Sequence, residues 1–249
     1  MSESGVTFSI ITVTYNSAKT IERTMRSVLN QRVLPVEYRI VDGQSTDDTL
    51  GIVESLRNDF AERGINLIVT SEPDNGIYDA MNKGIASVSG SIVGMINGDD
   101  WYEENALEVV KRAYEEEEFD LFYADLMMHR PDGGTFVKHA RNRKYATSRD
   151  WNHPTTFITS KVYRDYKYRT ETIHDDYDLI LRLKKNGFRI VVRNEVIANF
   201  TMNGVSHNRS LKDALARVKI KYGIYRRNGY SPFYLFECLL VEAGKLIIG

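Results

Sequence analysis

The first hundred residues alternate short apolar runs with longer amphipathic stretches, and this alternation leaves few folds open to the chain. Four runs rich in β-branched residues predict buried strands, at residues 8–16, 37–43, 65–72 and 91–100. Three stretches between them place apolar side chains at helical spacing, at residues 17–31, 45–64 and 76–90. Strands and helices in alternation predict a Rossmann-like α/β sheet flanked by helices.

The second half of the chain departs from this alternation. Residues 101–118 predict a helix with an acidic end, and two strands, 119–129 and 135–142, surround the turn sequence RPDGG. An amphipathic helix at 175–187 and a strand at 188–200 follow. Strands joined by a tight turn are antiparallel, so the predicted sheet is mixed.

Composition excludes several classes of protein. Hydrophobic residues make up 42% and charged residues 27% of the chain, and the net charge of −1 lacks the basic excess of proteins that bind nucleic acid. Cys238 is the only cysteine, which excludes an intrachain disulfide and a cysteine-rich zinc site. The amino terminus has neither a basic segment nor a long apolar stretch, so we expect no secretory signal and a cytoplasmic location.

Polar residues gather where each of the four predicted strands ends. They are Thr14, Tyr15 and Asn16 after the first strand, Asp42 after the second, Glu72 and Asp74 after the third, and Asp99 and Asp100 after the fourth. The carboxyl ends of parallel strands meet at one edge of a sheet, where loops and helix N-termini form ligand sites. We therefore expect these residues to share one binding site.

Asp99 and Asp100 are adjacent anions at the end of an apolar run. Such a pair needs open solvent, hydrogen-bond donors or a cation, because neighbouring carboxylates repel each other. One interpretation is a site for a hard divalent cation, Mg²⁺ or Mn²⁺, which prefers oxygen ligands. The other is a solvated turn in which an aspartate caps a helix.

Other polar residues also allow two interpretations. The hydroxyl, amide and carboxylate groups of Thr14, Tyr15, Asn16 and Asp42 suit a nucleoside, although each is also an ordinary loop residue. Lys83 could neutralise part of a diphosphate or lie on a plain surface helix. No GxGxxG follows the first strand and no Walker A spacing occurs, which disfavours a dehydrogenase and a P-loop kinase or ATPase.

Three aspartates, Asp175, Asp176 and Asp178, begin a predicted helix. The helix dipole stabilises acidic residues at this end, and a carboxylate there could also be a general base, so both roles stay open. His153 and His207 lack zinc-ligand spacing. Each could contact a ligand or form an ordinary loop hydrogen bond.

The last part of the chain, residues 207–249, changes in composition. Six basic residues between 212 and 227 precede an aromatic and aliphatic stretch at 233–248, which contains three charged residues and falls short of the ~20 apolar residues of a membrane-spanning helix. We expect residues 1–206 to form the main domain. The helical extension would then pack on it, dock on the inner face of the membrane, or form a homodimer interface.

Five stretches, in this order, resemble the family 2 glycosyltransferases of the GT-A fold: SIITVTYNSAKTIERTMRSVLNQ, VDGQSTDDT, EPDNGIYDAMNKGI, INGDDWY and DDYDLILRL. This is an inverting group that builds bacterial polysaccharides, and the third stretch resembles its exopolysaccharide and colanic-acid branch. Each motif alone is weak, but their order is specific. The resemblance covers residues 8–206 and implies a GT-A domain.

The resemblance also implies roles for single residues. The nucleotide pocket would be lined by Thr14, Tyr15, Asn16, Asp42, Asp74, Lys83 and Asp99. Within it, Asp42 would contact the base, Lys83 the diphosphate and Asp99 the ribose. Asp100, with Asp99, would hold Mn²⁺ or Mg²⁺. Asp176 would be the general base, and Asp175 stands where the family usually has a glutamate.

The implied activity is metal-dependent, inverting transfer of a sugar from a nucleotide diphosphate, most commonly UDP, to a glycan or lipid-linked acceptor during bacterial exopolysaccharide or lipopolysaccharide synthesis. A nucleotidyltransferase shares a similar sheet, but its usual glycine-rich basic loop is missing from TVTYNSAKT. A catalytically silent nucleotide-sugar-binding scaffold is the non-enzymatic alternative, and the intact carboxylates argue against it.

Overall fold

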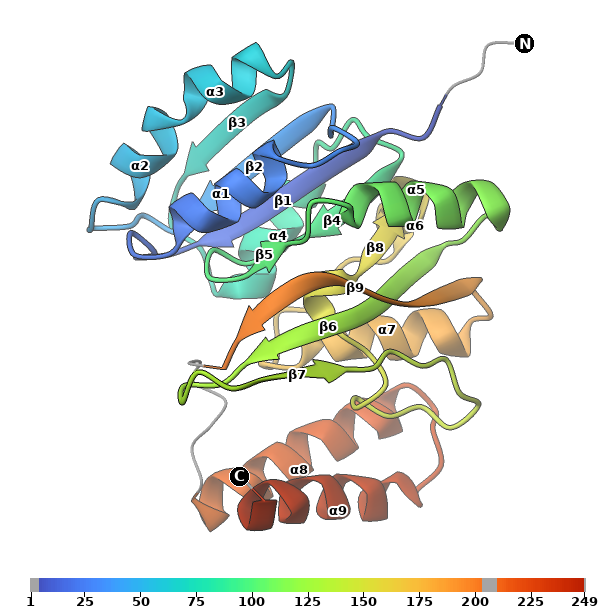
Figure 1. Ribbon diagram of the computed structural model, residues 1–249. Coiled ribbons are helices and arrows are strands. Elements are labelled where there is room, and N and C mark those ends of the chain that lie inside the picture. Colours follow the sequence, from blue (N-terminus) through green and yellow to red (C-terminus); the bar gives the residue numbers. More distant parts are fainter. Residues whose placement is uncertain (1–4, 203–209, 249) are drawn as a thin grey trace.

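A single mixed β-sheet organises the molecule (Figure 1). The computed structural model describes residues 5–202 and 210–248, the side chains of 245–248 excepted. The strands are β1 (Phe8–Thr14), β2 (Glu37–Asp42), β3 (Asn66–Ser71), β4 (Ile92–Met95), β5 (Trp101–Tyr102), β6 (Leu121–His129), β7 (Thr135–Lys138), β8 (Phe157–Thr159) and β9 (Ile190–Thr201). Their order in the sheet is β3-β2-β1-β4-β8-β6-β9-β5, with β7 paired to β6. The predicted mixed α/β sheet is therefore confirmed.

The first four strands of the chain form the parallel half of this sheet. β1 pairs in parallel with both β2 and β4, and β2 pairs in parallel with β3. Thr14 lies opposite Asp42, and Asp42 lies opposite Ser71, so these strands end at the same edge. β8 then runs antiparallel to β4, which changes the direction of the sheet.

Helices cover both faces of the sheet (Figure 1). They are α1 (Ile21–Leu29), α2 (Thr49–Ser55), α3 (Arg57–Glu62), α4 (Ile77–Ile85), α5 (Ala106–Glu116), α6 (Ser160–Asp165), α7 (Asp175–Lys185), α8 (Leu211–Arg227) and α9 (Tyr234–Ile248). Successive residues of a strand point to opposite faces. Ile10 accordingly joins the core beneath α1 and α5, while Ile11 joins the core beneath α4 and α7.

Two predicted helices differ from the structure. The helix predicted over 45–64 begins only at Thr49, because Asp47 accepts hydrogen bonds from the Thr49 amide and hydroxyl and keeps the preceding loop out of the helix. It also breaks at Leu56 into α2 and α3. The helix predicted over 101–118 was wrong at its start, since its first two residues pair with β9 as strand β5.

The C-terminal helices α8 and α9 pack on each other and on the domain. Glu242 of α9 is buried between Arg217 and Lys221 of α8, at 2.7 and 3.0 Å. The Tyr225 hydroxyl contacts that of Tyr177 in α7 at 3.0 Å. The predicted helical extension therefore packs on the main domain. The boundary proposed between residues 206 and 207, and His207, lie outside the described residues.

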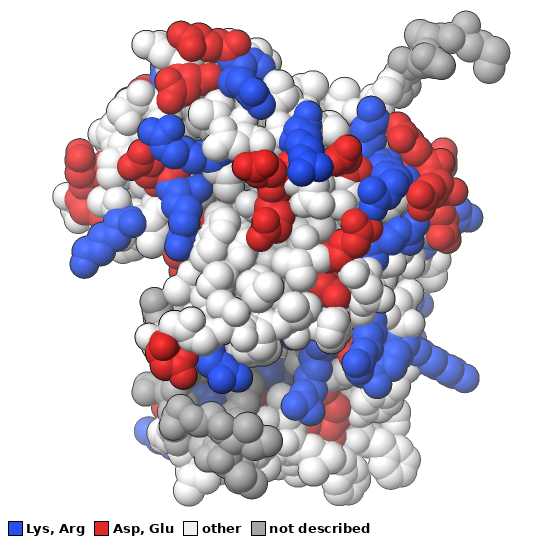
Figure 2. Space-filling model, viewed as in Figure 1, with Lys and Arg blue, Asp and Glu red and all other residues white. Residues whose placement is uncertain are grey.

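Charge is spread over the molecule. Figure 2 shows basic and acidic side chains interspersed over the upper part of the visible face. None of the described helices is long and apolar enough to cross a membrane.

Candidate active site

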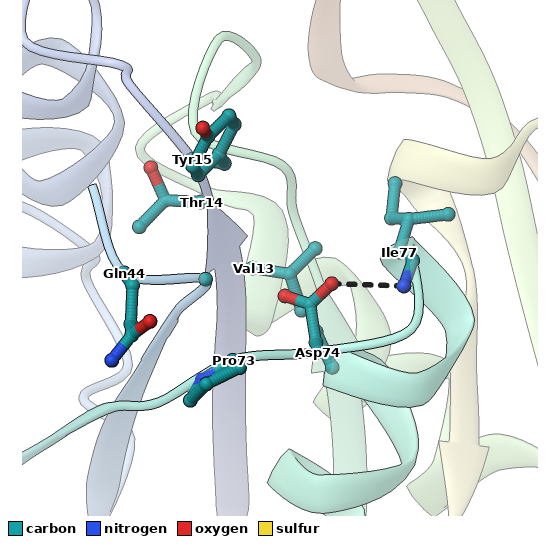
Figure 3. Close-up of a pocket in the computed structure, with 10 residues that line it drawn as sticks. Val13, Thr14, Tyr15, Gln44, Pro73, Asp74 and Ile77 are labelled. Carbon is teal, nitrogen blue, oxygen red and sulfur yellow. Dashed lines mark hydrogen bonds between the residues drawn. The ribbon is translucent and has the colours of Figure 1, made fainter. Parts of the chain in front are cut away.

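A pocket opens at the edge where the parallel strands end (Figure 3). It has a volume of about 490 Å³ and is lined by Val13, Thr14, Tyr15, Gly43, Gln44, Pro73, Asp74, Gly76, Ile77 and Ala80. These residues come from the ends of β1, β2 and β3 and the start of α4. Thr14, Tyr15 and Asp74, three of the predicted nucleotide-binding residues, therefore share one cavity.

Two of these residues leave polar or aromatic surface free for a ligand. The Thr14 hydroxyl is buried and has no hydrogen-bond partner within the described part of the chain. Tyr15 is 62% exposed beside it. A buried hydroxyl without a partner costs free energy unless a ligand or water satisfies it, so its position at a pocket wall favours a polar ligand.

Asn16 and Asp42 hold the loop that forms one wall of the pocket. Asn16 adopts a left-handed backbone, with φ of +50°, and its side-chain oxygen accepts from the Thr46 amide at 2.8 Å. Asp42 is fully buried, and its carboxylate accepts from the Ser45 amide and hydroxyl and from the Ser71 hydroxyl. Both residues thus order the loop, and their predicted contacts with a nucleoside stay predictions.

Asp74 and Lys83 shape the opposite wall. The Asp74 carboxylate accepts from the Gly76 amide at 2.8 Å, as the dashed line in Figure 3 shows. A Cβ atom on Gly43 would lie 2.6 Å from this carboxylate, so glycine is what lets the two walls approach. Lys83 contacts Glu72 at 3.0 Å and donates to the Pro73 carbonyl. The Lys83 ammonium group therefore stabilises the loop that precedes α4.

The turn that carries Asp99 and Asp100 is held by one face of α1. The hydroxyl of Thr20, which precedes the helix, donates to the Gly98 carbonyl at 2.7 Å. Arg23 donates to the carbonyl of Asp99 at 2.8 Å, and Thr24 to that of Asp100 at 2.5 Å. Three successive carbonyls are thus bound by side chains at helical spacing, which fixes the backbone from which both carboxylates project.

Asp100 is the unusual member of the pair. It is fully buried, and neither carboxylate oxygen has a hydrogen-bond partner among the described residues. Burial, and then repulsion from Asp99, raises the pKa of Asp100 well above its ordinary value. The Thr201 amide lies close enough to oppose this shift slightly but forms no hydrogen bond of normal geometry. A buried, unpaired carboxylate is costly without a cation.

These residues fit a divalent cation. Asp100 offers two oxygens without a protein donor, and Asp99 places a second carboxyl group beside it. Mg²⁺ bound with nucleotides takes one or two carboxylates and completes its shell with waters and phosphates. In the part of the chain that the structure describes, no group of three or more acidic, histidine or cysteine side chains is arranged to hold a metal ion, so a nucleotide would have to supply further ligands.

Asp176 reaches the same edge from the other half of the sheet. Its Oδ2 atom lies 4.0 Å from Nδ1 of His153, while its Oδ1 atom accepts from the Tyr177 amide at 2.6 Å. His153 precedes β8, which runs antiparallel to β4, so it lies near the end of β4 from which the chain continues to Asp100. Burial lowers the pKa of His153 although the charge of Asp176 opposes the shift, and neither ring nitrogen has a hydrogen-bond partner within the described residues.

Asp175, next to Asp176 in the chain, is fully paired within the structure. Its carboxylate accepts from the amides of Glu171 and Thr172, from the Thr172 hydroxyl, and from Arg227 at 2.9 Å. Burial alone would raise the pKa of Asp175, but these bonds outweigh it and the pKa is lowered. Asp175 is therefore committed to structure, whereas Asp176 lies beside His153 and Tyr78, and burial and then the charge of Asp176 raise the pKa of Tyr78.

The match to a known family decides among the folds that share such a sheet. A model described as glycosyl transferase family 2 matches residues 9–193. The chain belongs to glycosyl transferase family 2. The predicted family and enzyme class, a glycosyltransferase, are confirmed at this level, while the exopolysaccharide branch is not.

Curated relatives place this family 2 chain among glycan-related proteins. It is 36% identical over 134 residues to a "PGL/p-HBAD biosynthesis glycosyltransferase" of Mycobacterium bovis, covering 52% of this chain and 51% of the relative. It is 26% identical over 229 residues to the hyaluronan synthase of Pasteurella multocida, covering 89% of this chain and 22% of the relative. The chain thus spans about half or less of the length of these relatives.

Solved structures confirm the GT-A fold of this family 2 chain. The Staphylococcus aureus protein TarS, solved with UDP, superposes with a TM-score of 0.67 at 20% identity, covering 98% of this chain and 72% of TarS. The mannosyltransferase PcManGT of Pyrobaculum calidifontis, solved with GDP-Man and Mn²⁺, gives 0.69 at 18% identity, covering 98% and 70%.

Two arginines of this family 2 chain were missed by the sequence analysis. Arg23 binds the carbonyl of Asp99 and stacks 3.6 Å above the Trp101 ring. Arg227 contacts Asp175 and Asp178 at 2.9 and 2.8 Å. The spacing of Thr20, Arg23 and Thr24 on one helix face was a visible sign of the first contact, whereas nothing in the sequence connects Arg227 with residues 50 positions earlier.

Proposed function

We propose that this chain transfers a sugar from a nucleotide diphosphate, most simply a UDP sugar, to a hydroxyl group of a glycan or lipid-linked acceptor. The observation that carries the proposal is the buried, unpartnered carboxylate of Asp100, next to Asp99 at the carboxyl edge of the parallel strands. Such a group suits a cation that would itself bind a diphosphate. The named relatives support a role in the synthesis of cell-surface glycans. Within that class, exopolysaccharide or lipopolysaccharide synthesis is the role that we propose.

The donor half of the site would bind and orient the nucleotide. The exposed ring of Tyr15 offers a face on which a base can stack, and the free Thr14 hydroxyl offers a hydrogen bond. Asp42, Asp74 and Asn16 would hold the walls of the pocket in place. Asp99 and Asp100 would hold Mn²⁺ or Mg²⁺, which when bound supplies positive charge against the departing diphosphate.

Asp176 would be the general base. The acceptor oxygen attacks the anomeric carbon, the bond from that carbon to the diphosphate oxygen breaks, and the acceptor proton passes to Asp176. Attack from the face opposite the leaving group inverts the anomeric centre. His153, 4.0 Å from Asp176, would help to orient the acceptor hydroxyl and the carboxylate.

Donor binding can be measured by calorimetry with UDP, GDP, dTDP and their sugars, each with Mn²⁺ or with a chelator. We expect one nucleotide to bind in a metal-dependent way and Asp100→Asn to weaken that binding at least about tenfold, since a charged ligand of the cation is lost. Asp59→Asn, the same change on the exposed surface of α3, is the control. Failure of all nucleotides to bind, with or without metal, would overturn the donor assignment.

The general-base role of Asp176 can be tested without knowing the acceptor, because water can take the place of the acceptor hydroxyl. We expect Asp176→Asn to reduce the slow release of UDP from a bound UDP sugar by roughly a hundredfold or more, while donor affinity stays unchanged. Asp175→Asn should instead lower the thermal stability, since it loosens a fully paired structural carboxylate. An equal loss of donor affinity in Asp176→Asn would assign that residue to binding.

A further inference from the structure

The exposed side of α9 is apolar. Phe236 and Leu240 are 62% and 73% exposed, and Leu239 is 41% exposed. Together with Leu235 and Ala243 they form the whole exposed side of the helix between Tyr234 and Gly244, and none of them carries charge. Phe233, just before the helix, is 76% exposed. The lower right of the molecule in Figure 2, where Figure 1 places the start of α9, is accordingly mostly white.

The exposed side of α8 combines apolar and basic residues. Leu211 and Leu215 are 72% and 64% exposed. Lys212 and Lys219 lie on the same exposed side, because residues 211, 212, 215 and 219 follow one another at helical spacing. Neither lysine forms an ion pair with a described residue, and the one acidic residue of α8, Asp213, is partly buried.

The inner side of the helix pair already has its partners. Tyr225, Tyr234, Cys238 and Glu242 are buried between α8, α9 and the domain. Tyr225 and Tyr234 stack with their ring centres 4.2 Å apart. The exposed apolar residues are therefore additional to the hydrophobic core, and none of the described residues of this chain covers them.

We infer that the outer face of the helix pair, defined by Leu211, Leu215, Lys212, Lys219, Phe236 and Leu240, docks on the anionic surface of a lipid bilayer. Aromatic and aliphatic side chains enter the boundary between headgroups and acyl chains, while lysines beside them bind anionic headgroups. A second copy of the chain is less suited to this face, because a symmetric contact would bring the unpaired lysines of both copies together. The two lysines on α8 thus favour an anionic bilayer over a second copy of the chain as the partner of this face.

Docking through this face would bring the domain to lipid-linked substrates. α8 also carries Arg227, which contacts Asp175 and Asp178 at the start of α7, next to Asp176. The membrane-facing helix is thus joined directly to the helix that holds the proposed base. That consequence rests on the proposed function, whereas the docking itself does not.

Sedimentation with vesicles tests the inference. The 249-residue chain is mixed with vesicles of phosphatidylcholine alone, or with a third of phosphatidylglycerol, at low and high salt. We expect binding to the anionic vesicles that weakens with salt. Phe236→Glu/Leu240→Glu should abolish it, and Lys212→Gln/Lys219→Gln should weaken it roughly tenfold or more. Lys111→Gln on α5 is the matched control and should bind like the parent chain.

The outcomes that would overturn the inference are distinct. Absence of binding to both vesicles, or binding that is equal on neutral vesicles and unaffected by the lysine changes, would overturn it. So would a dimer in sedimentation velocity that Phe236→Glu dissociates, which would assign the face to a second copy. Circular dichroism checks that each variant is folded. UDP binding by the same variants separates the two proposals, since donor binding should persist when docking is lost.

Discussion

Asp100 illustrates how a single residue can oppose folding and serve a site. Its carboxylate is buried without a hydrogen-bond donor, and its pKa is raised well above the ordinary value, chiefly by burial. An acid with a raised folded-state pKa destabilises the native state at every pH above its unfolded pKa, about 4. The cost is therefore present at neutral pH and fades as the pH falls towards that value.

Replacing this carboxylate should stabilise the protein when no metal is present. We expect Asp100→Asn to raise the free energy of unfolding by about 1–3 kcal/mol at pH 7 in chelator, and the gain to vanish near pH 4. With Mn²⁺ and UDP the parent chain should gain about 2.7 kcal/mol at a hundredfold excess over Kd, and the variant, whose affinity is at least about tenfold lower, at most about 1.4 kcal/mol. Thermal melts in both buffers measure this. A variant less stable than the parent in chelator would contradict the account.

At the scale of elements, Arg227 connects the C-terminal extension to the proposed catalytic helix. It lies at the end of α8 and contacts Glu171, Asp175 and Asp178 around the first turn of α7. Asp175 and Asp178 are fully buried, so loss of the cation would leave them with fewer compensating groups. The extension thus supports the position of Asp176 without touching the pocket.

Removing this arginine should cost stability in a pH-dependent way. We expect Arg227→Leu to lower the free energy of unfolding by about 2–3 kcal/mol at pH 7. Because the pKa of Asp175 is lowered in the folded state, this contribution is present above its unfolded pKa and is lost as the pH falls through the folded value. The difference from the parent should therefore narrow below about pH 4.

Urea unfolding at pH 7 and at acid pH measures that difference. Arg32→Leu, which removes an exposed ion pair with Glu108, is the matched control and should change stability by less than about 1 kcal/mol. A loss of the same size at both pH values would show that Arg227 acts through packing and not through charge.

The order of the helices and strands was largely predictable from the sequence, whereas the interruptions within them were not. The four parallel strands follow from β-branched runs, and their shared edge follows from the rule that parallel strands end together. The break at Leu56 could not be predicted, because the apolar spacing of the sequence continues through it. In the structure, Arg57 donates to the Leu67 carbonyl and so helps to hold α3 against β3. Trp101 and Tyr102 likewise form a strand because of β9, a hundred residues away.

The positions of the candidate site residues were predictable at the strand ends and unpredictable where they depend on contacts across the fold. Asp99 and Asp100, with Thr14, Tyr15 and Asp74, stand where the strand pattern places them. The division of labour between Asp175 and Asp176 depends on Arg227 and His153, whose contacts span from 23 to 52 residues of sequence. No local pattern encodes such contacts, so the sequence left both carboxylates open.

At the scale of the whole molecule, the two sets of proposed site residues come from separate halves of the chain. Every residue proposed to hold the donor precedes residue 101, whereas Asp176 and His153 follow residue 150. The halves meet where β4 pairs with β8, and there Gly94 faces Phe157 so closely that a Cβ atom would lie 2.4 Å from the ring. The fold therefore contains a seam, closed in part by this glycine and aromatic ring and in part by α4, where the Asn82 side chain donates to the Tyr168 carbonyl. On the proposed function, the half that carries Asp176 could be exchanged across this seam, changing the acceptor, while the half that would hold the donor is kept.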